Sequence, residues 1–257
     1  MNLDISEYQN TIYHNPQRYD DQFWWKKNDM EFWKKIYNQL SNNKVLELGS
    51  GTGRLAIPLL KEGANYTGVE ISEEFCQHSD KKIKQQNLTA NFINKDFRNF
   101  ELHKTYDMIF IGFNSFLHLL TDLDVMKFLN TVKKHMHSNT LFYIDIFVPN
   151  PSFLHREKKR ERNLEYIDSL TNKITYIDEI SKYDIITGII KITWIYYSDS
   201  KKEDVRYYFT MKMYYPDTMN RLLIDAGFNI NNLWGDYNQS IFNESSELQI
   251  YECNLPN

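Results

Sequence analysis

The sequence predicts an α/β protein: a mostly parallel sheet with helices on both faces, interrupted late in the chain by an antiparallel meander. Three observations support this fold class. Residues 44–60 read as a strand, a glycine-rich turn and a helix, which is the layout of a nucleotide-binding crossover. Strand-like and helix-like segments then alternate as far as residue 147, as in a parallel sheet. Residues 174–215 instead hold three successive strand-like runs separated by turns.

The glycine-rich turn is the most informative stretch. Residues 44–54 read Lys-Val-Leu-Glu-Leu-Gly-Ser-Gly-Thr-Gly-Arg, so a buried strand ends at Leu48 and small residues follow it. Glycine accepts positive φ and lets the backbone approach a ligand closely. Such a turn also leaves N–H groups near the start of the next helix to face that ligand.

The spacing of the glycines separates two kinds of cofactor. A dinucleotide site favours G-x-G-x-x-G, whereas this chain has G-x-G-x-G with Arg54 at the position of the third glycine. Glu47 would repel a pyrophosphate and suits a ligand that carries positive charge. The next strand, 66–69, ends at Glu70, whose carboxylate can accept hydrogen bonds from both ribose hydroxyls of an adenine nucleoside. A nicotinamide oxidoreductase is therefore disfavoured, and a turn without a ligand is the plain structural alternative.

The segment 46–53 resembles motif I of the class I S-adenosylmethionine-dependent methyltransferases. This resemblance implies a Rossmann-like seven-stranded sheet, with S-adenosyl-L-methionine as cofactor and S-adenosyl-L-homocysteine as product. It also implies that Asp96, at the end of the strand-like run 91–97, binds the adenine amino group and that Phe97 covers the ring. The run 106–111 resembles the family's fourth strand, after which methyl donor and acceptor meet.

The resemblance thus gives a set of expected cofactor-binding residues. They are Glu47, Gly49, Ser50, Gly51, Gly53, Arg54, Glu70, Ile71, Asp96, Phe97, Phe113 and Asn114. Helices over 73–86 and 123–137 and a strand over 141–147 continue the expected order.

Composition bounds the function classes. A chain of 257 residues suits one large domain, or one domain with an elaboration. The net charge of −4 argues against a broad nucleic-acid surface. Cys76 and Cys253 suit neither a disulfide framework nor a zinc site, and Asp145 has no evident acidic partner, so we expect no metal. No signal peptide or membrane-spanning run is evident, so we expect a cytoplasmic protein, bacterial by its richness in Asn, Lys, Ile and Tyr.

Four segments are expected along the chain. Residues 1–40 form an N-terminal helical lid, 41–150 the cofactor-binding core, 151–215 the antiparallel insertion that caps the substrate or pairs two subunits, and 216–257 the completion of the core. The charged run 156–162 either binds an anionic substrate or, more commonly, forms a solvated helix face. The helix predicted to start at Pro216 and the edge strand 246–253 match the end of the family's core.

The N-terminal aromatics and the insertion narrow the resemblance. The Tyr19-Asp20 pair, the meander and the Arg206-Tyr-Tyr strand look like small-molecule N-methyltransferases. The resemblance implies an in-line methyl transfer in which alignment and desolvation matter most. The expected catalytic residues are His118, Tyr19 and Tyr13. The expected substrate-binding residues are Trp24, Arg98, Asn114, His118, Trp194 and Arg206.

Other interpretations stay open at this point. Tyr13, Tyr19 and Trp24 are lid candidates, but each could equally pack in a core. His118 could be a helix residue packed under a lid, and Arg98 could be an ordinary exposed arginine. A macromolecular methyltransferase acting on RNA or protein, or a non-catalytic S-adenosylmethionine-binding protein, are the competing functions. The partner is expected to be a small-molecule acceptor, with no nucleic acid and no membrane, and the chain a monomer or homodimer.

Overall fold

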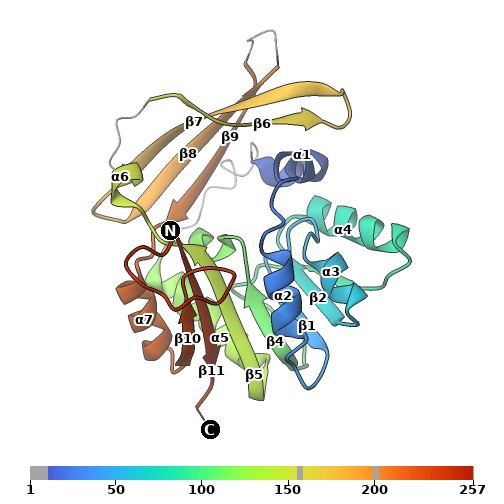
Figure 1. The fold of residues 1–257 in the computed structure, drawn as a ribbon, viewed down its shortest axis with the longest axis vertical. Helices are drawn as coiled ribbons and strands as arrows, with labels where there is room; N and C mark the ends of the chain where they lie inside the picture. Colours follow the sequence, from blue (N-terminus) through green and yellow to red (C-terminus); the bar gives the residue numbers. More distant parts are fainter. Residues whose placement is uncertain (1–10, 155–158, 199–202, 257) are drawn as a thin grey trace. The chain divides into compact units, whose positions relative to one another are not determined.

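The computed structural model describes residues 11–154, 159–198 and 203–256 (Figure 1). The chain divides into two compact units. Unit 1 comprises Met1–Lys26 and Asn150–Met213, and unit 2 comprises Lys27–Pro149 and Tyr214–Asn257. The boundary near the N-terminus therefore falls at Lys26, earlier than the expected limit at residue 40, so the helix that follows belongs to unit 2.

Unit 2 is built on a seven-stranded sheet with the order β10-β11-β5-β4-β1-β2-β3. Neighbouring strands run parallel except that β11 is antiparallel to both β10 and β5. This arrangement confirms the predicted Rossmann-like sheet. Because β1, β2, β3 and β4 run parallel, the chain segments that follow them lie along one edge of the sheet. The strands are β1 (Lys44–Leu48), β2 (Asn65–Glu70), β3 (Asn91–Asn94), β4 (Tyr106–Ile111), β5 (Met136–Phe147), β10 (Asn229–Trp234) and β11 (Leu248–Asn254).

Helices cover both faces of this sheet (Figure 1). Side chains cap the first turns of two of these helices: the Ser72 hydroxyl accepts the N–H of Phe75 at 3.1 Å, and the Thr121 hydroxyl accepts that of Asp124 at 3.1 Å. Pro216 occupies the first position of α7, as predicted. The helices of unit 2 are α2 (Met30–Tyr37), α3 (Ala56–Lys61), α4 (Glu73–Gln85), α5 (Asp122–Lys134), α7 (Pro216–Asp225) and the short 3-10 helix η3 (Ser115–His118).

Large aromatic side chains fill the core of unit 2. On the α2 side, the Trp33 ring lies 4.5 Å from the Phe110 ring, centroid to centroid, and 6.1 Å from that of Tyr143. Elsewhere in unit 2, Phe128 of α5 packs against Phe142 of β5 at 6.1 Å. Removing a buried aromatic of this kind costs about 3–5 kcal/mol. The core thus fixes the strand ends from which the functional turns emerge.

Unit 1 is a four-stranded antiparallel sheet in the order β6-β7-β8-β9, with short helices beside it in the sequence. Three strands were expected here. The fourth, β6, begins at Glu161, inside the charged run that was expected to be a helix face. That expectation was wrong over residues 159–162, and 155–158 lie outside the described residues. The elements are η2 (Ile12–His14), α1 (Pro16–Gln22), α6 (Pro151–Leu154), β6 (Glu161–Asp168), β7 (Lys173–Asp184), β8 (Ile189–Tyr197) and β9 (Glu203–Lys212).

A charge network explains why the run at 159–162 is extended. Asp178 of β7 accepts Arg160 Nε at 2.7 Å and Arg162 Nε at 3.1 Å. The Arg162 guanidinium also lies 4.2 Å from the centre of the Tyr176 ring. Cross-strand ion pairs and cation–π contacts of this kind are available to a strand that pairs with β7. The pattern of charges alone did not reveal that pairing.

Candidate functional site

The turn after β1 adopts the backbone that its glycines allow. Gly49, Gly51 and Gly53 have φ values of +70°, +56° and +70°, in the left-handed region that glycine tolerates best. A Cβ placed on Gly51 would meet nothing within 4 Å, so the backbone borders open space there. The turn therefore offers a close approach to a ligand at Gly51.

Several N–H groups of the turn itself are used within the protein. The Gly49 and Ser50 N–H groups donate to the Val69 carbonyl at 2.8 and 3.1 Å, and Gly53 N–H donates to the Ser50 carbonyl at 3.0 Å. The expectation that N–H groups at the start of α3 face a ligand stays a prediction. The turn itself offers space, which suits a ligand without phosphate.

Glu70, at the end of β2, is held by the backbone of two turns. Its two carboxylate oxygens accept the N–H of Gly51 at 2.9 Å and the N–H of Ser72 at 2.9 Å. Burial raises the pKa of Glu70, and these backbone hydrogen bonds oppose that rise. A carboxylate has about four lone-pair positions, so this oriented side chain keeps capacity for further donors such as ribose hydroxyls.

Glu47 lies on β1 in a buried polar cluster that the sequence did not reveal. The Tyr66 hydroxyl donates to its carboxylate. Burial raises the pKa of Glu47 to about 8, although Tyr66 and the nearby Arg54 oppose the rise. Glu47 is therefore mostly protonated at neutral pH in the unliganded chain, whereas the expectation above treated it as a fixed negative charge.

Arg54 is paired with a carboxylate inside unit 2. Its Nη1 and Nη2 atoms each lie 2.7 Å from one oxygen of Asp29, whose side chain is 0% exposed. The guanidinium also lies 5.4 Å from the centre of the Phe113 ring. A bidentate pair of this type fixes the arginine firmly, so it orders the region between α2, the turn after β1 and the turn after β4.

Turns from three strands meet at Gly49. A Cβ on this residue would lie 3.0 Å from the Ser115 side chain, in the segment after β4, and 3.7 Å from the Phe97 ring, in the segment after β3. The structure therefore brings together the expected cofactor residues Gly49 and Phe97 with the turn that holds Phe113 and Asn114. Ile71, directly after β2, is half-exposed.

The turn after β4 has two successive residues with positive φ, Phe113 at 49° and Asn114 at 68°. The Asn114 side-chain oxygen accepts the N–H of Phe147 at 2.9 Å. The Asn114 amide can still offer a ligand its N–H₂ group and the second lone pair of that oxygen. His118 lies at the end of η3 and is half-buried.

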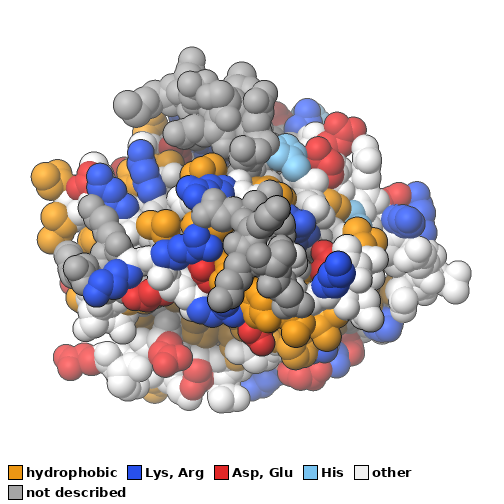
Figure 2. Space-filling model, turned by 90° about the horizontal axis from the view of Figure 1, so that it is seen from above, with side chains coloured by type: hydrophobic (Ala, Val, Ile, Leu, Met, Phe, Trp, Pro, Cys, Tyr) orange, Lys and Arg blue, Asp and Glu red, His pale blue; other side chains and the backbone are white. Residues whose placement is uncertain are grey.

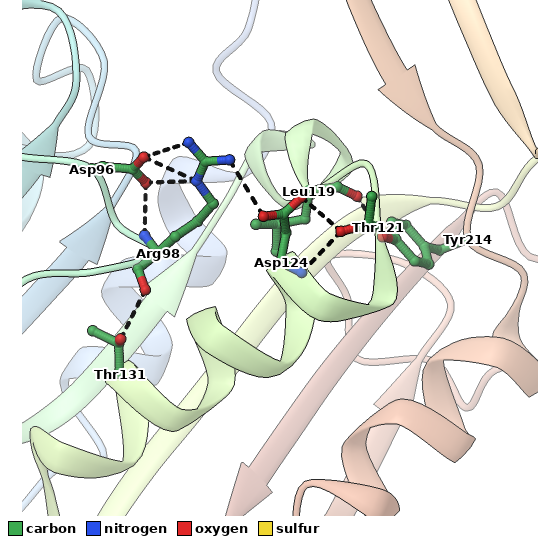
Figure 3. Close-up of polar contacts among 7 residues, drawn as sticks. All are labelled: Asp96, Arg98, Leu119, Thr121, Asp124, Thr131 and Tyr214. Carbon is green, nitrogen blue, oxygen red and sulfur yellow. Dashed lines mark hydrogen bonds and ion pairs between the residues drawn. The ribbon is translucent and has the colours of Figure 1, made fainter. Parts of the chain in front are cut away.

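Asp96 and Arg98 bind each other rather than standing apart (Figure 3). Asp96 accepts the Arg98 N–H at 2.8 Å, and Arg98 Nη2 reaches the Asp96 carboxylate at 2.6 Å. Arg98 Nη1 also lies 3.5 Å from Asp124, and the Thr131 hydroxyl donates to the Arg98 carbonyl at 2.9 Å. A guanidinium neutralised by two carboxylates is a poor site for an acceptor anion. The adenine role of Asp96 stays a prediction.

The expected lid and substrate residues of unit 1 fall into different environments. Tyr13 and Tyr19 are partly buried and pack against the cluster formed by Ile12, Tyr166, Ile177 and Tyr196. This packing accounts for the two tyrosines without a ligand.

Other unit 1 residues are less enclosed or bound to neighbours. Trp24 is 60% exposed. Trp194, on β8, donates its Nε1 hydrogen to Glu179 of β7 at 3.0 Å. Arg206 lies on β9. The structure leaves the acceptor roles of these residues as predictions.

Sequence analysis did not predict the polar contacts made near the turns by the buried residues Asp29, Tyr66 and Asp145 or by the partly buried Tyr237. Asp29 and Tyr237 stand far along the chain from the motifs they contact, and no spacing rule connects them. Asp145 carried a signal, because an acid within the strand-like run 141–147 needs a partner when buried. That partner is the Tyr237 hydroxyl, which donates to Asp145 Oδ2 at 3.0 Å.

Three further observations concern surface charge, metal ligands and membrane-spanning helices. Figure 2 shows Lys and Arg side chains interspersed with Asp and Glu on the face that it draws. Among the described residues, no group of three or more His, Cys, Asp or Glu side chains is placed to hold a metal ion. No helix in the described part of the chain has the length and apolar character needed to cross a membrane.

The sheet order, the glycine turn after β1 and the acidic residue ending β2 define the class I methyltransferase fold. A family model described as a methyltransferase domain matches residues 45–139. A methyltransferase of Geobacillus sp. is 28% identical over 112 residues, which is 44% of this chain and 45% of that protein. A ubiquinone biosynthesis O-methyltransferase of Rickettsia akari is 27% identical over 109 residues, 42% of each chain. The match thus spans less than half the length of these curated relatives.

Solved structures share the fold over nearly the whole chain. An S-adenosylmethionine-dependent methyltransferase from Clostridium acetobutylicum has a TM-score of 0.76 at 18% identity, covering 93% of this chain and 97% of that one. The CcbJ methyltransferase from Streptomyces caelestis has a TM-score of 0.78 at 21% identity, covering 89% and 95%. A sugar N-methyltransferase from a Streptoalloteichus species has a TM-score of 0.70 at 12% identity, covering 91% and 90%. Residues 45–139 thus match a methyltransferase domain, and the chain as a whole shares the fold of S-adenosylmethionine-dependent methyltransferases.

Proposed function

We propose that the chain methylates an amine of a small molecule, with S-adenosylmethionine as the methyl donor. The observation that carries the proposal is the pair formed by the open glycine turn at Gly51 and the oriented carboxylate of Glu70. This pair offers space for a nucleoside and acceptors for its ribose hydroxyls, with no row of free N–H groups for a phosphate. The cofactor, when bound, supplies a methyl group on a sulfonium, and the chain needs to align and desolvate the amine that attacks it.

We assign the cofactor-binding roles to the residues around Gly49. Glu70 would take the ribose, Ile71 and Phe97 would border the adenine, and Asp96 would accept its amino group. Arg54 acts by holding its neighbours, because Asp29 engages its guanidinium. Glu47 would face the positively charged end of the cofactor and ionise as that charge arrives.

The acceptor roles are supported by chemistry rather than by contacts. A neutral amine needs only to be positioned and to lose a proton after the transfer, and His118 is the titratable group nearest in sequence to the turn after β4. Tyr13, Tyr19 and Trp24 supply aromatic surface of the kind that holds amines by cation–π attraction. The sugar N-methyltransferase among the structural neighbours supports an amine on a small molecule.

O-methylation is the second candidate, because the Rickettsia akari relative is named an O-methyltransferase. The net charge of −4 weighs against an RNA substrate. A chain that binds the cofactor without transferring its methyl group is the remaining alternative.

A methyl-transfer screen tests the proposal. The purified chain is incubated with S-adenosylmethionine and matched pairs of compounds, each amine against the analogue with a hydroxyl in its place. Formation of S-adenosylhomocysteine and of a product heavier by one methyl group is followed by mass spectrometry. We expect turnover with amines and little with the hydroxyl analogues.

Two variants make the screen specific. Glu70→Ala should abolish most of the turnover, whereas Glu73→Ala, an exposed acid at the start of α4, should not. Turnover confined to the hydroxyl analogues would establish O-methylation. Cofactor binding without turnover on either series would favour a non-catalytic protein.

A further inference from the structure

Phe113 and Asn114 form a strained turn directly after β4. Both have positive φ, 49° and 68°. Asparagine enters the left-handed region readily, whereas a bulky aromatic residue rarely does. A residue held in such a region costs on the order of 1–3 kcal/mol and persists only where its surroundings enforce it.

Asp145, on the neighbouring strand β5, holds this turn at two points. The Phe113 N–H donates to Asp145 Oδ2 at 3.3 Å, and the Asn114 N–H donates to the Asp145 backbone carbonyl at 3.2 Å. Asp145 is 2% exposed, so a buried carboxylate accepts a hydrogen bond from the backbone of the turn. Burying a carboxylate is expensive unless hydrogen bonds compensate it.

Tyr237 supplies such a bond from a distant segment. Its hydroxyl donates to the same Asp145 Oδ2 atom at 3.0 Å. The residue lies in the connection between β10 and β11, and its ring is anchored 5.6 Å from that of Phe32 in α2. Burial and the adjacent carboxylate raise the pKa of Tyr237 well above its ordinary value, so the hydroxyl keeps its proton.

The turn that these residues hold adjoins the cofactor-binding turn. Ser115, the next residue, lies against Gly49, and the Arg54 guanidinium lies over the Phe113 ring. We propose that Tyr237 and Asp145 are positioning residues, which keep the Phe113–Asn114 turn in its left-handed conformation and so keep the cofactor site shaped for binding. The link to binding rests on the proposed function, whereas the link to the turn does not.

Tyr237→Phe is the variant that tests this, because it removes one hydroxyl and keeps the ring. Two quantities are measured on the full chain: hydrogen exchange of the Phe113 and Asn114 amides, and the affinity for S-adenosylmethionine by calorimetry. We expect exchange at these amides to rise about tenfold and the affinity to fall at least about fivefold.

Tyr143→Phe is the matched control. Tyr143 is buried on β5, the strand of Asp145, and its hydroxyl donates to a carboxylate oxygen of Glu252 at 3.0 Å. Both variants lose a hydroxyl bonded to a carboxylate, so a similar fall in Tm is expected. Only Tyr237→Phe should alter the exchange of the turn amides and the cofactor affinity.

Asp145 variants give a graded response. Asp145→Asn keeps an oxygen that can accept the Phe113 N–H, so its turn amides should exchange more slowly, and its affinity for S-adenosylmethionine should be higher, than in Asp145→Ala.

The proposal would be overturned if the turn amides of Tyr237→Phe exchanged as slowly as those of Tyr143→Phe. Fast exchange with unchanged affinity would also overturn it, because the turn would then have no influence on binding. Hydrogen exchange needs no ligand, so a chain that binds no S-adenosylmethionine would refute the proposed function separately.

Discussion

Gly49 and Ser115 lie in contact, although one follows β1 and the other follows β4: a methyl group on Gly49 would lie 3.0 Å from the Cβ and Oγ atoms of Ser115. This contact joins the glycine turn to the turn beside which methyl transfer is expected. Gly51, two residues later, has no atom within 4 Å of its own Cβ position. Two glycines of one motif therefore serve different purposes, close packing at Gly49 and open space at Gly51.

Alanine at each glycine should separate these purposes. Both residues have positive φ, so each substitution costs roughly 1–2 kcal/mol from the backbone alone. Gly49→Ala adds a clash with Ser115 and should be the more destabilising of the two in urea unfolding. Gly51→Ala should lose less stability and yet bind S-adenosylmethionine poorly, because its methyl group enters the open space. The double variant Gly49→Ala, Ser115→Gly should recover stability. Equal losses of stability at the two positions would contradict this account.

Loss of the Glu70 carboxylate should weaken cofactor binding. Glu70→Ala removes hydrogen bonds to a charged group, which are worth about 1.5–3 kcal/mol, so the Kd for S-adenosylmethionine should rise roughly 10-fold to 150-fold. Calorimetric titration measures it, with Glu73→Ala as the exposed control. An unchanged Kd would remove Glu70 from the site.

Binding of the cofactor should release a proton from Glu47. Its pKa of about 8 leaves the carboxyl mostly protonated at pH 7 in the unliganded chain, and a cationic ligand favours the ionised form. The binding enthalpy should therefore differ between phosphate and Tris buffers at one pH, and Glu47→Gln should abolish the difference. The same enthalpy in both buffers would show that Glu47 keeps its protonation state.

The same group should make stability depend on pH. Folding raises the pKa of Glu47 above its ordinary value of 4.5, to about 8. Between these two pH values the folded chain holds a proton that the unfolded chain has lost. Its contribution is present below about pH 4.5 and is lost as the pH rises towards 8, at no more than about 1.4 kcal/mol per pH unit. Urea unfolding across this range should show a steeper loss of stability with rising pH in the wild type than in Glu47→Gln, whose remaining slope comes from other groups such as Glu70.

Trp24 offers a test of the lid. It is 60% exposed, so Trp24→Ala should change the free energy of unfolding by no more than about 0.5 kcal/mol. If the side chain contacts the acceptor, KM for the acceptor should rise while the Kd for the cofactor stays the same. Tyr19→Ala is the contrasting variant, because Tyr19 packs in unit 1 and its loss should lower Tm. Unaltered KM in Trp24→Ala would exclude Trp24 from acceptor binding.

Local pattern accounts for much of the fold. Alternating strands and helices, the glycines after Leu48 and the proline at position 216 predicted the parallel sheet, its first crossover and the start of α7. These features depend on neighbours in the chain, and so the sequence displays them. The strand at β6 was missed, because its arginines pair with Asp178 on another strand and a run of charges does not disclose its partner.

What the sequence by itself determined was the fold class and the position of the glycine turn after β1, since glycine spacing and strand ends are local properties. Only the tertiary structure decided the state of the groups around that turn. Burial raises the pKa of Glu47, Arg98 forms an ion pair with Asp96, and the Tyr237 hydroxyl donates a hydrogen bond to Asp145. Burial and hydrogen-bond partners come from residues distant in the chain, and they appear only when the strands are assembled.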